Sequence, residues 1–188
     1  MTNTTHPIAG TQPVQPSTQV QAQPLLTLLH HLGTHSHLQS VVAGLPRAVP
    51  VEQLRQHHSA DPYHVNLDNQ GLTLTLQCIN PSAQPEELTW GLHGFTLDAA
   101  SWDGGWPAGL NPHEATASDV LAVFAPNPEE VVNMHPMLCF AVQGQTQEGL
   151  LHTWSVMALF EAAGKRLSSL SFLRTGDWRA LELGATKG

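Results

Sequence analysis

The chain has 188 residues, a formal net charge of −8 with histidine neutral, and 41% hydrophobic residues. This length and composition are typical of one compact soluble domain, or of two small units that share a core. The excess of acid argues against a general nucleic-acid binder, which needs basic residues to neutralise phosphates, and no apolar run reaches the roughly 18 residues that a membrane span requires. The same charge suits a partner protein that is itself basic.

Residues 1–24 are rich in Thr, Gln and Pro. They contain too little apolar side chain to offset the entropy lost on ordering, so we expect a disordered tail. The segment also lacks the basic start and the apolar block of a secretory signal, which makes a cytoplasmic protein the default expectation.

Helices followed by strands are predicted over the first half of the chain. Leucines at 25, 26, 28, 29 and 32 have helical spacing, and Gly33 can end that helix. A second helix, over 38–44, stops before Pro46, because the residue before a proline is pushed out of the helical region. Alternating apolar residues then predict strands over 63–67, 72–77 and 88–97, with a turn at 69–71 and a bend at Gly91 or Gly94.

The second half follows the same plan. A helix over 116–124, capped by Thr116 or Ser118 and stopped at Pro126, precedes strands over 137–142, 150–160 and 167–172, with turns at 143–149 and 163–165. At an offset of about 80 residues, Leu74 falls on Trp154 and the 44–46 stop falls on 124–126. We therefore predict an α+β fold of two tandem units of short helices packed on an antiparallel sheet, 25–103 and 104–188.

The stretch SWDGGWPAGL, residues 101–110, lies between these two units. Its glycines permit a chain reversal. Trp102 and Trp106 could fill the seam between the units, or could stand exposed as anchors for a partner, since tryptophan is enriched at binding hot spots. Both interpretations stay open, and one tryptophan could serve each.

Paired acids offer a second candidate for a binding surface. Adjacent carboxylates are usually a solvated edge or a helix start, and the alternative is an acidic rim that meets a basic partner. Two acids beside the tryptophans would extend such a rim. The predicted partner-binding residues are Trp102, Asp103, Trp106, Asp98, Glu86, Glu87, Glu129 and Glu130.

Histidine is over-represented, with 12 residues against 7 Lys plus Arg. A cluster reads HHLGTHSH, from His30 to His37. His31 and His35 are four apart, as two ligands on one helix face would be, but Gly33 and Thr34 interrupt the helix and no acid or cysteine lies within the cluster. We predict no metal site and no cofactor.

No catalytic residues are predicted. His57, His58 and His64 lie near Asp61, and a Ser/His/Asp set could be drawn with Ser59. No GxSxG elbow surrounds a serine, and neighbours in one loop seldom face each other as a triad must. Cys139 and His135 lack an orienting third residue. Both cysteines, Cys78 and Cys139, lie in apolar runs, which favours buried thiols over a disulfide. The chain is therefore not expected to be an enzyme.

A family resemblance covers residues 38–174. The segments WPAGLNPHEATASDVLAVFAPNPEE and LLHTWSVMALFEAAGKRLSSLSF resemble a pattern in immunity proteins of bacterial polymorphic toxin systems. Residues 106–110 match its LPxGL element, 118–126 its capped helix and stop, with Ala125 where glycine is common, and Trp154 and Phe160 its later strand. The implied architecture is similar to that of the beta-lactamase inhibitory protein and of outer-membrane assembly lipoprotein E, and these relatives act by binding.

The resemblance implies a cytoplasmic immunity protein that neutralises a cognate toxin by covering its active site. The acidic charge of the chain favours a nuclease as that toxin. The alternative is a chaperone or adaptor that loads an effector into a secretion system, and a His-dependent metal protein is a third. The expected partner is thus a toxin or effector protein, with no nucleic acid and no membrane. Whether the chain is a monomer or a homodimer is left open.

Overall fold

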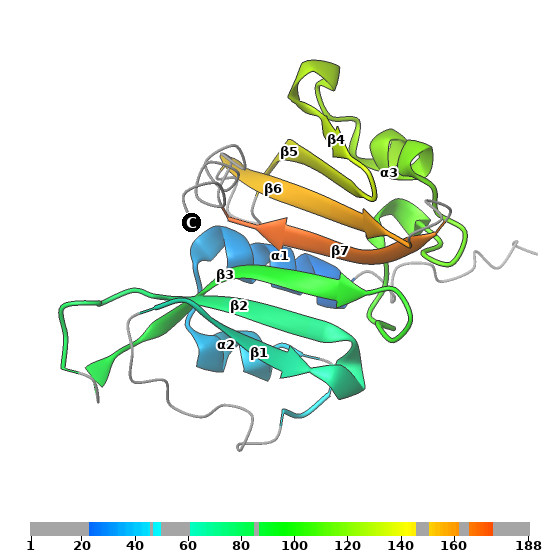
Figure 1. Ribbon diagram of the computed structural model, residues 1–188. Helices are drawn as coiled ribbons and strands as arrows, with labels where there is room; N and C mark the ends of the chain where they lie inside the picture. The colour runs from blue at the N-terminus through cyan, green and yellow to red at the C-terminus, as the bar shows by residue number, and fades with distance from the viewer. Residues whose placement is uncertain are drawn as a thin grey trace, which may run out of the picture.

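The computed structural model describes residues 23–45, 47–49, 61–84, 87–145, 151–161 and 166–174. These residues form the α-helices α1 (Gln23–Thr34), α2 (Leu38–Ala43) and α3 (Ala117–Phe124) and one antiparallel sheet (Figure 1). Its strands are β1 (Tyr63–Leu67), β2 (Leu72–Cys78), β3 (Trp90–Asp98), β4 (Val132–Met134), β5 (Met137–Gln145), β6 (Leu151–Phe160) and β7 (Leu167–Leu173). The predicted α+β class is confirmed. Residues 1–22 of the predicted tail and the 163–165 turn lie outside the described residues, and Gln23 and Pro24 begin α1.

The seven strands run in the order β1-β2-β3-β7-β6-β5-β4. The last strand of each half of the chain, β3 and β7, therefore pair at the centre of the sheet. Their register sets Phe95 opposite Phe172 and Asp98 opposite Ser169. The two halves stay on separate sides and meet at this pair, within one continuous sheet. That the halves arose as tandem copies stays a prediction.

The α-helices and the core share one face of the sheet. α1 and α2 contact β3 and α3 contacts β6, and Figure 1 shows α1 and α2 behind the strands. Phe95 stacks on Phe172 with ring centroids 5.0 Å apart, and Phe124 of α3 lies 6.0 Å from Phe172. Phe95 and Phe172 are buried, and the partly buried Phe124 packs against them, so both halves share a single hydrophobic core. On the opposite face the strands present smaller and more polar side chains, among them Thr96 and Ser171, whose hydroxyls hydrogen-bond at 2.8 Å.

Local sequence explains most element boundaries. Gly71 takes φ 62° at the end of the predicted 69–71 turn, and a register shift in β2–β3 pairing falls beside Gly94, one of the two positions predicted for a bend. Thr116 proves to be the cap of α3, and Ala125 ends that helix at φ 42°. The three-residue strand β4 was not predicted, and β5 extends to Gln145, past the predicted start of a turn.

None of the described helices is long and apolar enough to cross a membrane. Cys78 and Cys139 are both buried, as predicted.

Candidate binding surface

The segment after β3 begins with a turn organised by Asp98. One oxygen of its carboxylate accepts hydrogen bonds from the backbone N–H groups of Ala100 and Ser101, each at 3.0 Å, and from the Ser101 hydroxyl at 2.7 Å. Such Asx turns are a common structural use of aspartate. Asp98 is exposed, so it shapes the turn and still places a negative charge at the surface.

Trp102 is part of the hydrophobic core. Its side chain is 5% exposed, and its indole N–H donates to the carbonyl oxygen of Gly105 at 2.7 Å. A Cβ on Gly104 would lie 2.8 Å from the Trp102 ring atom Cε2, so glycine is needed for the chain to fold over the indole. Trp102 was predicted either to fill the seam between the halves or to contact a partner. Its burial means that it packs in the core and does not stand at the surface.

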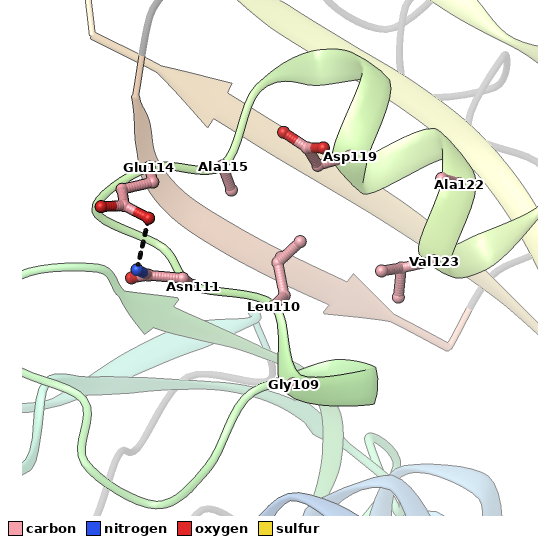
Figure 2. Close-up of a pocket in the computed structure, with 8 residues that line it drawn as sticks. All are labelled: Gly109, Leu110, Asn111, Glu114, Ala115, Asp119, Ala122 and Val123. Atoms are coloured by element: carbon pink, nitrogen blue, oxygen red, sulfur yellow. Dashed lines mark hydrogen bonds between the residues drawn. The ribbon is translucent and has the colours of Figure 1, made fainter.

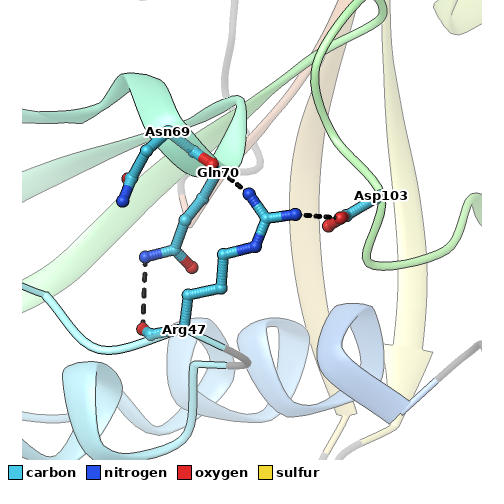
Figure 3. A network of polar contacts seen from close by, with 4 residues as sticks. All are labelled: Arg47, Asn69, Gln70 and Asp103. Carbon is cyan, nitrogen blue, oxygen red and sulfur yellow. Dashed lines mark hydrogen bonds and ion pairs between the residues drawn. The ribbon is translucent and has the colours of Figure 1, made fainter.

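Asp103 holds the same segment to the first half of the chain. Its carboxylate accepts a hydrogen bond from the Arg47 guanidinium, which also donates to the carbonyl oxygen of Asn69 (Figure 3). Behind this contact the buried Gln70 amide donates to the Arg47 carbonyl oxygen at 3.2 Å. Because Asp103 and Arg47 are exposed and neutralise each other, Asp103 adds little net charge to a binding rim.

The chain then continues along a half-buried Trp106 into a single 3-10 turn, Pro107–Gly109, and a buried Leu110. Asn111 begins a second turn, in which its side-chain oxygen accepts from the His113 N–H at 3.2 Å and its amide donates to Glu114 at 3.0 Å. This turn leads directly to Thr116, the N-cap of α3.

A pocket of about 510 Å³ lies between this loop and α3. Its lining residues are Gly109, Leu110, Asn111, Glu114, Ala115, Asp119, Ala122 and Val123. Figure 2 shows Glu114 and Asn111 joined at one end, Asp119 on α3 above them, and Leu110 and Val123 projecting between the loop and the helix. The described lining thus combines two carboxylates with apolar side chains and includes no basic residue.

Hydrogen bonding keeps one of these carboxylates ionised. The Thr116 hydroxyl and the Thr116 backbone N–H donate to Asp119 at 2.7 and 2.8 Å, which lowers the pKa of Asp119 below its ordinary value. No described basic side chain forms an ion pair with Asp119 or Glu114. The described lining of the pocket therefore contains two carboxylates and no basic side chain to offset them.

The remaining predicted acids are scattered. Glu87 is exposed in the connection between β2 and β3, and Glu129 and Glu130 are exposed in a 3-10 turn, Pro128–Glu130, between α3 and β4. No described contact joins Glu87 to the other two. Glu86 lies outside the described residues. These described acids of the predicted rim thus lie in two different connections of the chain, one between β2 and β3 and one between α3 and β4.

The histidine cluster forms a structural junction between α1 and β3. His35 has φ 51° and lies against Gly91, where a Cβ would come 2.7 Å from His35 Nε2. His35 Nδ1 lies 3.4 Å from the Arg174 guanidinium, and the backbone N–H of Arg174 donates to the carbonyl oxygen of His93. Burial first, and the nearby Arg174 charge second, lower the pKa of both His35 and His93. Among the described residues no group of three His, Cys, Asp or Glu is placed to hold a metal ion, and His57, His58 and Ser59 lie outside them.

These lowered pKa values predict that the protein is less stable in mild acid. The unfolded chain binds protons to these imidazoles below about pH 6.5, whereas the folded protein resists their protonation, so stability is full above pH 6.5 and falls as pH drops below it. His35→Asn removes one such group and tolerates a positive φ. Urea unfolding at about pH 7.5 and about pH 5.5 should show a smaller loss in the variant than in the parent. An equal loss in both would show that His35 does not contribute.

The sequence did not identify Asn111, Glu114 and Asp119 as residues that line a pocket. Two local patterns include these residues. NPHE indicates an Asx turn with a nearby acid, and in TASD Asp119 stands three residues after Thr116, as a capping box requires. Both patterns describe local hydrogen bonding. That they face each other across a pocket depends on how the loop packs over the sheet.

Comparison with protein-family models, with curated proteins and with solved structures finds no match to this chain.

Proposed function

We propose that the chain is an immunity protein that binds a cognate bacterial toxin in the cytoplasm and neutralises it. The observation that carries this proposal is the acidic pocket between the 107–111 loop and α3. Its lining begins three residues after Trp106 in the chain and falls within the segment that resembles immunity proteins, and the chain as a whole carries a net charge of −8. These features support a partner with a basic surface.

The pocket is suited to a lysine or arginine side chain of that partner. Such side chains have an apolar stem and a charged head. Leu110 and Val123 offer contact to the stem, and the carboxylates of Glu114 and Asp119 offer acceptors to the head. Arginine fits best, because its planar guanidinium can hydrogen-bond to carboxylates through several N–H groups.

Binding at this pocket would inhibit the toxin by covering the surface with which the toxin binds its substrate. A toxin that cleaves nucleic acid must itself present basic residues to phosphates. If the pocket takes one of those residues, the substrate and the immunity protein compete for the same surface. A nuclease is therefore the toxin class that this chemistry favours.

Glu114→Gln tests the pocket with little change of shape. We expect the variant to raise the Kd for the purified toxin about tenfold, because one of two uncompensated carboxylates is lost. Calorimetric titration at low and high salt should also show a weaker salt dependence than for the parent. Glu87→Gln, an equal change of charge on a distant exposed loop, is the matched control and should shift the Kd less than about twofold.

Trp106 supplies an independent test of the same surface. Trp106→Ala should weaken the complex more than Glu87→Ala does, because the indole can add buried apolar contact at the pocket edge. Equal small effects of the two substitutions would place the toxin on another face.

A further inference from the structure

The face of the sheet opposite the helices carries an apolar patch at its β4–β6 end. In antiparallel sheets, directly opposed residues point to the same side. The register pairs Met134 with Met137 and Met137 with Leu159, and it pairs Met157 with Cys139 in the next row. Leu138 and Phe140 alternate with these residues and point to the core. We call Met134, Met137, Met157 and Leu159 the methionine patch.

The methionine patch is accessible and its composition is unusual for this chain. Leu159 is 41% exposed and Met134 is 37% exposed, and they are two of the four large hydrophobic residues with such exposure among the described residues. Met137 and Met157 are half-buried. The patch holds three of the chain's four methionines. Methionine is flexible and polarizable, and it is over-used at surfaces that adapt to apolar partners.

Acidic residues stand on two sides of the methionine patch. Along the row Met134–Met137–Leu159 the next partners are Ser169 of β7 and then Asp98 of β3. On the other side, Glu129 and Glu130 precede β4. Glu130 is two residues from Val132, which shares a row with Cys139 and Met157, so the Cα atoms of Glu130 and Val132 are no more than about 7.6 Å apart. Glu161 and Arg166 follow β6 and precede β7, where their opposite charges offset each other. Counted over the described residues alone, the surroundings of the patch are therefore negative on balance.

We infer that the methionine patch is a second binding surface, and that it takes an amphipathic α-helix with basic flanks from a partner protein. Such a segment would set its apolar side chains on Met134, Met137 and Leu159 and its lysines or arginines near Asp98 and Glu130. This inference does not depend on the acidic pocket, which lies with α3 on the other face of the sheet.

A helix fits this surface better than an extended segment. Extended peptides gain most from backbone hydrogen bonds at a sheet edge, and the methionine patch lies on a face. From β4 to β6 the row crosses two strand spacings, about 9.6 Å. Residues i and i+7 of a helix are about 10.5 Å apart along its axis, so two turns match the length of the row.

A designed peptide tests the inference directly. The probe is a helical peptide of about 18 residues with leucines at i, i+3, i+4 and i+7 and lysines on the flanks, labelled for fluorescence anisotropy. We expect the full chain to bind it, and we expect Leu159→Gln combined with Met134→Gln to raise the Kd at least about tenfold. Ile79→Gln, at another exposed apolar residue, is the matched control and should change the Kd less than about twofold.

The contribution of the basic flanks of the peptide is tested separately. Replacing the peptide's lysines with glutamates should weaken binding at least about tenfold, and a scrambled peptide of the same composition should bind as weakly. The inference is overturned if the designed peptide does not bind, if the scrambled peptide binds equally well, or if Leu159→Gln with Met134→Gln has no effect. It is also overturned if sizing shows a dimer that these two substitutions dissociate, since a second copy would then be the occupant.

Discussion

Replacing Phe172 with alanine is expected to lower the free energy of unfolding by about 3–5 kcal/mol, the usual loss for a buried phenylalanine. The Phe172 side chain is 1% exposed. It lies on β7 opposite Phe95 of β3, and Phe124 of α3 packs against the same ring. Truncation leaves a cavity where both halves of the chain meet. Urea unfolding followed by circular dichroism and tryptophan fluorescence measures the loss.

The two probes should report a single transition, because β3 and β7 belong to one sheet and one core. Leu159→Ala is the control on the opposite face of the same sheet and should cost less than about 1 kcal/mol. Should Phe172→Ala prove too unstable to purify, Phe172→Leu provides a milder version of the same test. Two separate transitions in the parent protein would contradict a shared core.

Gly71→Ala is the second large effect we expect, a loss of about 2–5 kcal/mol. Gly71 has φ 62°, and an added Cβ would lie 2.5 Å from the carbonyl carbon of Ser101 and closer still to the Trp102 amide nitrogen. Two costs therefore add, the left-handed backbone and a collision with another backbone segment. Because that segment leads to the pocket loop, the variant should also weaken toxin binding.

Gly109→Ala separates these two costs. Gly109 has φ 74°, and no heavy atom lies within 4 Å of the position that its Cβ would take. Only the backbone cost applies, so the expected loss is about 1–2 kcal/mol. If Gly71→Ala and Gly109→Ala lower the free energy of unfolding by similar amounts, the 98–102 turn shifts at little cost to make room for the added methyl group.

Sequence periodicity predicts most of this fold because each strand is half-buried. Leu72, Leu74 and Leu76 alternate with polar residues, and the structure buries all three leucines. The strand β4 has only three residues, Val132–Met134, and two of them are exposed. So short a segment has no period to detect, and it is held in place by pairing with β5.

The candidate site was less predictable, for a physical reason. Trp102 and Trp106 are four residues apart with the same side chain, yet Trp102 packs in the core and Trp106 is only half-buried. Which indole turns inward depends on Gly104 and on the contact with Gly71, far away in the sequence. Likewise, Asp103 reads as a surface acid, and only the tertiary structure supplies Arg47 as its partner.

The proposed immunity role is tested most directly by growth. The chain is co-expressed with the protein encoded beside its gene, and complex formation and cell survival are scored for the parent, for Glu114→Lys and for the control Glu87→Lys. The account predicts a tight complex and rescued growth with the parent and the control, and loss of both with Glu114→Lys. Absence of a complex and of rescue with the parent would contradict the immunity role and favour an effector-loading adaptor, whereas full rescue by Glu114→Lys would contradict the acidic pocket as the toxin's binding site.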